Sequence, residues 1–454
     1  MSSRREGQIS IGLNVLGFGA HPGAWRKAEA GATAHLDIAY YQNIARIAER
    51  GCLDAVFLAD WSALSGDPAS QPVGHLDPVV LLSAVAAATR RIGVIATAAS
   101  TYNDPFGTAR RFASLDHVSQ GRAAWNLVTS ASDEAARNFS LPGVPGHAER
   151  YARAEEFLEV VLKLWDSWED DAIIGDAAGG RFADPGKVRP IDFVGRHFAV
   201  EGPLNVPRSP QGRPVLVQAG SSEPGKVLGS RYAEVIFTTQ TTLDAGQRFY
   251  RDIKERAVRW GRNPAHLKIM PGLATVIGST EAEARARFDE LNAWHGEQGL
   301  LERVAARFGL VASELDPDGP LPWARIGEVG EFERGSQGFL EAQLNLARQE
   351  NLSIRQLSRR ILVGHRLLVG TPEQVADSLE TWFQGHAADG FNIMPDVLPS
   401  GVERFVDEVV PLLQRRGLFR QEYSGSTLRE HLGLPFPDNQ YSRIPHALPS
   451  IGQQ

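Results

Sequence analysis

Three polar side chains lie within or at the end of short apolar runs. Asp60 ends VFLAD, Thr97 lies in VIATAAS, and Asn126 lies in GRAAWNLVTS. A buried amide without hydrogen-bond partners costs about 1–3 kcal/mol, so a ligand that carries donors and acceptors would account for Asn126. Alternation along a strand puts Trp125 on the opposite face, toward outer packing. A turn cap for Asp60, space-filling for Thr97 and a satisfied structural amide for Asn126 remain competing interpretations.

Two further groups of residues suit an anion at the start of a helix. Ser221 and Ser222 follow an apolar run in QAGSSEPG, whereas His147 and Tyr151 are four apart in HAERYARAEEF and share one helix face. Free N–H groups and the helix dipole favour a phosphate at such positions. Serine is also a common N-cap, and a histidine near a helix start is often simply solvated, so both interpretations stay open.

The segment GFGAHPGAWRKAEA follows the first apolar run of the chain. Its His21, Trp25 and Arg26 stand in a glycine-rich stretch, which is more typical of a loop that faces a substrate than of a linker. The alternative is that Trp25 packs into the core and Arg26 is solvated.

The elements that must position these residues follow a regular alternation. The predicted strands are 8–16, 54–60, 92–99, 122–130, 214–219, 234–239, 268–277 and 391–397. The predicted helices are 35–50, 78–90, 106–118, 147–168, 222–232, 244–260 and 371–384. Alternation favours an α/β fold with a parallel sheet, and eight units favour a closed (β/α)₈ barrel over a doubly wound open sheet, which remains the alternative. Reactive groups of such barrels gather at the C-terminal strand ends, so the polar residues would surround one mouth.

The sequence predicts a single barrel domain that spans residues 1–454. Three segments depart from its alternation of strands and helices. Residues 169–213 are rich in Gly, Pro and Asp, and residues 279–365 read as a mainly helical, polar insertion. Long segments of this kind are usually functional, so we expect both to be lids over the mouth. Residues 417–454 are expected to form an irregular tail along the surface or along a neighbouring subunit.

Composition excludes several classes of protein. The 454 residues carry a formal net charge of −7 and show no basic stripe, so neither nucleic acid nor a membrane surface is an expected partner. Cys52 is the only cysteine and the histidines lack ligand spacing, so we expect no metal. No run approaches the roughly 18 apolar residues of a membrane span, and the N-terminus has no apolar signal segment. We expect a cytoplasmic protein.

The most specific stretch runs from 101 to 130 and ends in GRAAWNLVTS. It resembles the bacterial-luciferase-like flavin monooxygenases. The resemblance is closer to the subfamily of nitrilotriacetate monooxygenase component A, dibenzothiophene-sulfone monooxygenase and long-chain alkane monooxygenase. Supporting stretches are GAWR, HAERYARAEEFLEVVLKLWDSW, QAGSSEPG and LLVGTPEQVADSLETWFQGHAADGFNIMPDVLP. The similarity extends from about residue 8 to 416.

The resemblance implies a luciferase-like (β/α)₈ barrel that receives reduced FMN from a separate NAD(P)H-dependent flavin reductase. Such enzymes insert one oxygen atom from O₂ into a small organic substrate, often with cleavage of a C–N or C–S bond. No GxGxxG motif follows the first strand, which fits NAD(P)H acting on the reductase instead. A homodimer or homotetramer is also implied.

The resemblance also assigns roles to the candidate residues. Asp60, Thr97 and Asn126 would line the flavin ring and ribityl chain. The phosphate would be held by His147, Tyr151, Ser221 and Ser222. His21 matches the catalytic histidine that faces the substrate or the reacting oxygen, although Ala20 stands where some relatives carry a second histidine. Trp25 and Arg26 would contact the substrate.

Two other functions remain open at this point. A deazaflavin-dependent dehydrogenase of the same barrel superfamily would transfer hydride and need no oxygen. A flavin-binding protein without catalysis would release only peroxide. Because one fold carries many substrates, the substrate stays undefined.

Overall fold

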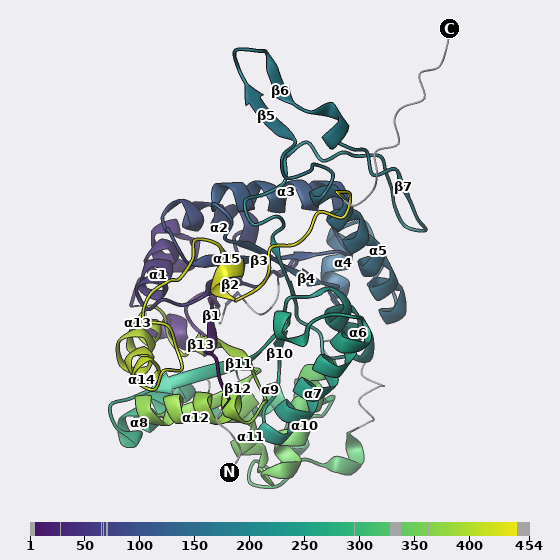
Figure 1. Cartoon of the computed structure of the whole chain (residues 1–454). Helices are drawn as coiled ribbons and strands as arrows, with labels where there is room; N and C mark the ends of the chain where they lie inside the picture. Colours follow the sequence, from purple (N-terminus) through teal and green to yellow (C-terminus); the bar gives the residue numbers. More distant parts are fainter. Residues whose placement is uncertain are drawn as a thin grey trace.

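The computed structural model describes residues 5–442 apart from 28, 65, 67, 70, 295, 327–336 and 362. The described residues build a parallel nine-stranded sheet, eight strands of which close into a barrel (Figure 1). The barrel strands are β1 (Ser10–Asn14), β2 (Ala55–Leu58), β3 (Gly93–Ala99), β4 (Ala123–Val128), β9 (Val215–Gln218), β10 (Val235–Thr238), β11 (Lys268–Ile277) and β13 (Gly390–Pro395).

Closure follows from the pairing of β10 with β11, in which Val235 lies opposite Lys268. The strand order around the barrel is therefore β1–β2–β3–β4–β9–β10–β11–β13, and β13 returns to β1. All eight strands were predicted, so the (β/α)₈ barrel is confirmed and the open doubly wound sheet is wrong. A ninth strand, β12 (Arg366–Gly370), pairs with the second half of the long β11 and was not predicted.

Helices surround the barrel on its outside (Figure 1). They are α1 (Ile38–Arg50), α2 (Pro78–Ala87), α3 (Pro105–Val118), α5 (His147–Trp165), α6 (Glu223–Tyr232), α7 (Leu243–Arg259), α12 (Pro372–Gln384), α13 (Ser400–Arg404) and α14 (Val410–Arg415). Asp37, Asp77 and Asp104 begin the first three of these helices, since each side chain accepts a hydrogen bond from a first-turn N–H group. A short helix that was not predicted, α4 (Asp133–Asn138), follows β4. Among the described residues, no helix combines the length and apolar character that a membrane span requires.

Trp125 occupies the outer face of β4, as predicted. It is fully buried among the rings of Phe112, Phe157 and Trp165, between the barrel and helices α3 and α5. Its Nε1 donates to the carbonyl oxygen of Ala98 at 3.0 Å, which satisfies the indole. Asn126, one residue on, therefore faces the barrel interior.

The tail closes the N-terminal end of the barrel, where Figure 1 shows α15 (Leu428–His431) across the opening. Leu428 is fully buried in a cluster with Phe57, Ile95 and Val235, all of which point into the barrel. A capping box between Thr427 and Glu430 begins the helix. Residues 428–434 thus form a plug, which differs from the expected irregular surface tail because three leucines, at 428, 432 and 434, fill the barrel floor.

The segment 169–213 also lies at the N-terminal end of the barrel. It leaves the C-terminus of α5 and contains two hairpins, β5 (Ile173–Asp176) with β6 (Arg181–Ala183), and β7 (Phe193–Val194) with β8 (Ala199–Val200). Helices of the barrel run antiparallel to its strands, so a segment that joins α5 to the start of β9 begins and ends at the end opposite the mouth. The segment is therefore an appendage at the N-terminal end of the barrel and not the expected lid over the mouth.

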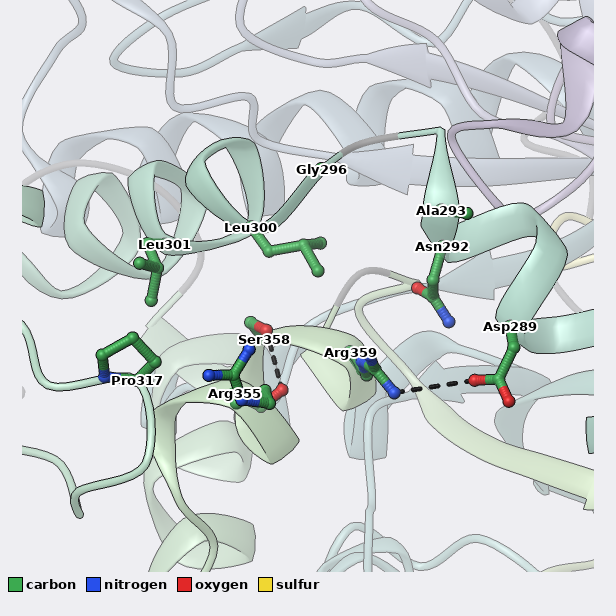
Figure 2. Close-up of a pocket in the computed structure, with 10 residues that line it drawn as sticks. All are labelled: Asp289, Asn292, Ala293, Gly296, Leu300, Leu301, Pro317, Arg355, Ser358 and Arg359. Atoms are coloured by element: carbon green, nitrogen blue, oxygen red, sulfur yellow. Dashed lines mark hydrogen bonds and ion pairs between the residues drawn. The ribbon is translucent and has the colours of Figure 1, made fainter.

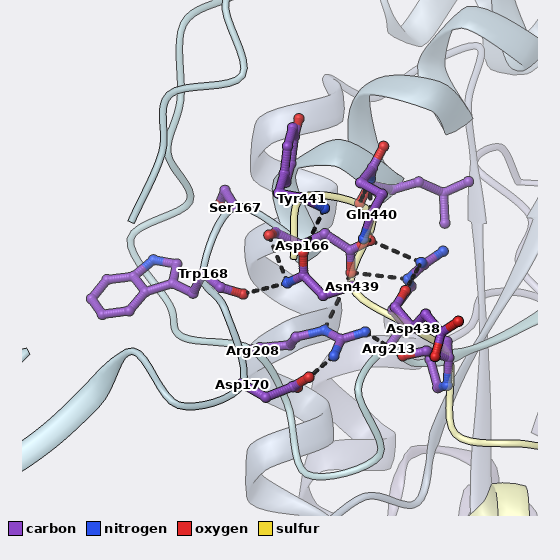
Figure 3. A network of polar contacts seen from close by, with 12 residues as sticks. Asp166, Ser167, Trp168, Asp170, Arg208, Arg213, Asp438, Asn439, Gln440 and Tyr441 are labelled. Carbon is purple, nitrogen blue, oxygen red and sulfur yellow. Dashed lines mark hydrogen bonds and ion pairs between the residues drawn. The ribbon is translucent and has the colours of Figure 1, made fainter. Parts of the chain in front are cut away.

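A polar network holds this appendage to the tail (Figure 3). The buried carboxylate of Asp166 lies 3.2 Å from Arg208 Nε and 2.8 Å from Arg213 Nη2. Asn439 donates to the carbonyl oxygens of Asp166, at 2.9 Å, and Trp168, at 2.7 Å. The tail and the end of α5 are therefore joined below the barrel.

The insertion 279–365 starts from the opposite end, since β11 ends at the mouth. Its helices are α8 (Glu281–Ala293), α9 (Gly296–Phe308), α10 (Gln337–Gln349) and α11 (Ile354–Ile361). The last three share a separate apolar cluster around Phe308 and Leu344, whereas Leu291 of α8 belongs to the core of the barrel. The insertion is thus a small helical layer with its own core beside the mouth.

Candidate functional site

A cavity of about 550 Å³ opens at the C-terminal ends of the barrel strands, and we call it the mouth cavity. Asp60, Thr97 and Asn126 all line it, together with Asn14 at the end of β1. Thr97 and Asn126 are register partners on β3 and β4, so both side chains point to the same side of the sheet. The structure therefore brings together the three residues that the strand ends predicted.

Two of the residues that line this cavity, Asn14 and Asn126, carry a buried amide oxygen that has no hydrogen-bond partner among the described residues. Asn126 Nδ2 donates to Thr97 Oγ1 at 2.9 Å, and that hydroxyl donates to the carbonyl oxygen of Leu58 at 2.7 Å. The Oδ1 atoms of Asn126 and Asn14 are buried and accept no hydrogen bond from the described residues. Buried acceptors nearly always find a donor, so these two oxygens are suited to the N–H or O–H groups of a ligand.

Asp60 is the acidic group of the mouth cavity. Burial, followed by the neighbouring charge of Asp77, raises the pKa of its carboxyl, and a hydrogen bond from Ser62 at 3.4 Å opposes the rise. A carboxyl with a raised pKa is a hydrogen-bond partner that gains a proton more readily than an exposed aspartate.

His365 lines the mouth cavity and was missed by sequence reasoning. Its ring stacks on Phe237 at 4.9 Å and meets Phe339 edge-on, while Nδ1 lies 3.3 Å from Thr239 Oγ1. Burial lowers the pKa of His365 to about 3, so the imidazole is neutral at physiological pH. It sits between the insertion and β12, a place that no periodic pattern in the sequence indicates.

A second polar group lies where α5 and α6 begin. The rings of His147 and Tyr151 are 4.9 Å apart, and Ser222 Oγ donates to the Tyr151 hydroxyl at 3.3 Å. A Cβ at Gly220 or Gly225 would lie about 3 Å from that hydroxyl, so two glycines leave open the space beside it. Ser222 is also the N-cap of α6. Three predicted residues therefore meet at two helix N-termini, a place that suits an anion.

Ser221 and Arg150 modify this prediction. Ser221 lines a neighbouring cleft with Lys226 and Arg248 and not the mouth cavity. Arg150 was not predicted, yet it lies in the first turn of α5, donates to the carbonyl of Ser130, and its buried Nε has no partner among the described residues. Its place in the sequence, between the two residues expected to hold a phosphate, could have identified Arg150.

The loop after β1 borders a second cavity of about 390 Å³, which we call the side cavity. His21 and Trp25 line it, and Leu16, Ala59 and Trp61 line both cavities. His21 Nδ1 accepts from the N–H of Gly23 at 3.0 Å, which leaves the ring proton on Nε2. That nitrogen lies 3.4 Å from Asn292 Oδ1 of α8.

Arg26 does not line either cavity. Its Nη1 donates to the carbonyl oxygen of Trp294 at 3.1 Å, and its guanidinium lies over the Trp294 ring at 5.5 Å. The side chain therefore fastens the loop to the insertion. The prediction of a substrate contact for Arg26 has no support from this position.

A further cleft of about 310 Å³ lies within the insertion, between α8, α9 and α11 (Figure 2). Its arginines are paired: Arg359 lies 3.6 Å from Asp289, and Arg355 Nε lies 2.9 Å from Asp318. Asn292 lines the cleft and also contacts His21. This residue therefore stands between the cleft and the loop that borders the side cavity.

Comparisons with known proteins agree on one family. The sequence pattern of the luciferase-like monooxygenases matches residues 20–389. The chain is 47% identical over 451 residues to nitrilotriacetate monooxygenase component A of Aminobacter aminovorans, which covers 96% of this chain and 98% of that protein. It is 40% identical over 432 residues to dibenzothiophene-sulfone monooxygenase of Rhodococcus erythropolis, with coverages of 92% and 94%. A solved riboflavin lyase with modified FMN and riboflavin has a TM-score of 0.81 and 33% identity, with coverages of 95% and 97%.

Proposed function

The chain belongs to the luciferase-like monooxygenases, and we propose that it takes reduced FMN from a separate flavin reductase and inserts one oxygen atom of O₂ into a small organic substrate. The observation that carries the proposal is the mouth cavity, whose lining includes two asparagines with a buried amide oxygen that has no hydrogen-bond donor among the described residues. Cleavage of a C–N or C–S bond after oxygen insertion is part of the proposal.

The residues present fit FMN. Asn126 and Asn14 would accept hydrogen bonds from the ring or ribityl chain, while Thr97 keeps Asn126 in place. Tyr151, Ser222 and His147 would hold the phosphate in the space that Gly220 and Gly225 leave open, with Arg150 as an added cation. Reduced FMN would supply the two electrons with which one oxygen atom enters the substrate and the other becomes water.

The chain itself would exclude water and position protons. Phe237, Phe339 and the neutral His365 form an apolar wall of the mouth cavity, to which the insertion contributes Phe339. A closed, dry site is needed because water would divert the reaction to peroxide. The insertion is the proposed lid, and His21 would keep its Nε2 proton at the side cavity.

The reductase is a proposal that a relative's name supports. The nitrilotriacetate enzyme is called component A, which implies a second component. Transfer of reduced FMN by diffusion or by direct contact, a homodimer or homotetramer, and work in the cytoplasm belong to the same proposal.

Reconstitution tests this function. The chain, FMN, NADH and a flavin reductase are mixed with a panel of organic substrates, and oxygen uptake, peroxide and product are measured together. We expect oxygen uptake that rises with one class of substrate while peroxide falls. Peroxide alone across the panel would favour a flavin-binding protein, whereas anaerobic turnover of a reduced deazaflavin would favour a dehydrogenase.

Tyr151→Phe tests the phosphate position. Loss of a hydrogen bond to a charged group costs about 1.5–3 kcal/mol, so we expect FMN to bind roughly tenfold or more weakly. Riboflavin, which has no phosphate, should bind as it does to the parent chain. Flavin fluorescence titrations measure both, with Tyr232→Phe as control, because that hydroxyl contacts Glu159 on the outer helices. Equal loss of FMN and riboflavin would remove Tyr151 from the phosphate site.

A further inference from the structure

We propose that the substrate of this chain is an uncharged aromatic or heteroaromatic molecule with a hydrogen-bonding group, and that it binds in the side cavity. This inference rests on the proposed function, because the side cavity shares Leu16, Ala59 and Trp61 with the cavity assigned to FMN. A volume of about 390 Å³ is within the range of small-molecule sites, roughly 300–1,000 Å³.

The side cavity offers nothing to neutralise an anion. Among the described residues that line it there is no lysine and no arginine, nor is there one among those that line the mouth cavity, where Asp60 adds an acidic group. The sequence of residues 61–76, which supplies one wall, also contains no lysine and no arginine. A carboxylate buried here would lose its hydration without gaining a partner.

Several cations of the loop and the insertion are engaged with partners outside the side cavity. Arg26 contacts Trp294, and Lys27 Nζ pairs with Glu290 at 2.6 Å on α8. Arg355 and Arg359 line the separate cleft of the insertion; Arg359 pairs with Asp289 (Figure 2), and Arg355 pairs with Asp318. Arg26 and Lys27 therefore attach the loop to the insertion, and Arg355 and Arg359 form ion pairs within the insertion.

The polar side chains that line the side cavity include three imidazoles, the amide of Gln71 and the hydroxyl of Tyr41. His21 accepts a hydrogen bond at Nδ1 from the N–H of Gly23, which is a role of the neutral imidazole. Burial lowers the pKa of His35. Burial, followed by the neighbouring charge of His35, lowers the pKa of His75. Neutral imidazoles hydrogen-bond to uncharged oxygen and nitrogen groups without requiring a counter-charge.

Aromatic side chains form part of the lining of the side cavity, and one imidazole nitrogen there has no hydrogen-bond partner among the described residues. Trp25, Tyr41 and Trp61 line the cavity, with the Trp61 ring 5.1 Å from that of His75. His35 Nδ1 is buried and makes no hydrogen bond to the described residues, while the Tyr41 hydroxyl donates to the His35 carbonyl at 2.9 Å. A flat ring would pack between these side chains, and one polar group on it would form a hydrogen bond with His35 Nδ1.

This substrate class separates the chain from the relative that it matches at 47% identity. Nitrilotriacetate carries three carboxylates, whereas dibenzothiophene sulfone is an uncharged tricycle. Sequence identity alone would favour the first, yet the charges around the side cavity favour the second. Fold and family do not determine the substrate, but the residues of the site do.

A matched pair of probes tests the proposal. Naphthalene-1-carboxamide and naphthalene-1-carboxylate have the same shape and differ in charge, and nitrilotriacetate serves as the polyanion. Binding to the full chain with FMN present is measured by calorimetry. We expect the amide to bind about tenfold or more tightly than either anion. Equal or tighter binding of an anion, or no binding of the amide, would overturn the proposal.

Leu76→Arg locates the binding to the side cavity. Leu76 lines the rim and is partly exposed, so an arginine there can reach the cavity without disturbing the core. We expect the preference for the amide to shrink or reverse, whereas Val80→Arg, on the exposed face of α2, should keep it. An unchanged preference in Leu76→Arg would contradict the assignment. FMN affinity in the same samples reports the proposed function separately, because FMN would bind in the mouth cavity.

Discussion

Replacing Asn126 with leucine is expected to weaken FMN binding while leaving the fold at least as stable. The substitution removes an amide whose Oδ1 is buried without a partner, and leucine has a similar volume. A flavin group left unpaired costs about 1–3 kcal/mol, which corresponds to a roughly five- to 150-fold rise in Kd. The free energy of unfolding should fall little, because Thr97 still donates to the Leu58 carbonyl. Flavin titration and urea denaturation of the same samples measure the two effects.

Asn392→Leu is the matched control. Asn392 of β13 is also buried inside the barrel, and its Oδ1 has no partner in the described part of the chain, but it is not among the residues that line the mouth cavity. Its replacement should leave FMN affinity unchanged. If both variants lose FMN equally, the effect comes from the barrel interior in general and Asn126 has no specific role.

Leu428→Ala is expected to destabilise the whole barrel from the end opposite the site. The side chain is fully buried against strands β2, β3 and β10, and truncation of such a leucine costs roughly 2–5 kcal/mol. We expect a lower midpoint in urea with an unchanged slope, and unchanged FMN affinity in the folded protein.

Val80→Ala provides the comparison for this variant. Val80 is 72% exposed, so its truncation should change the free energy of unfolding by no more than about 0.5 kcal/mol. A loss below about 1 kcal/mol in Leu428→Ala would show that the tail merely lies against the barrel floor. The plug would then be dispensable for stability.

Much of the barrel was predictable because its signals are local. Apolar runs of fixed length alternate with helical stretches, and aspartates at helix starts mark the boundaries. The exceptions depended on distant partners. Strand β12 forms only because β11 is long enough to hold another neighbour, and α15 gains its stability from a barrel floor far away in sequence.

The site divides in the same way. Asn126 could be predicted from the period of its strand, and Asn14, which ends SIGLN, could have been found by the same reasoning. His365 could not, because it reaches the mouth through the fold of the insertion and packs on Phe237 from another strand. The segment 169–213 was expected as a lid from its length alone, and length gives no information about the end of the barrel at which a loop emerges.

Isotope labelling tests the central claim most directly. The chain, FMN, NADH, a flavin reductase and a substrate that stimulates oxygen uptake are incubated under ¹⁸O₂ in ordinary water. We predict a product that carries one labelled oxygen atom per turnover, and loss of that product in Asn126→Leu at subsaturating FMN. A product labelled from water instead, or one formed without oxygen, would contradict the assignment of this barrel as a reduced-FMN monooxygenase.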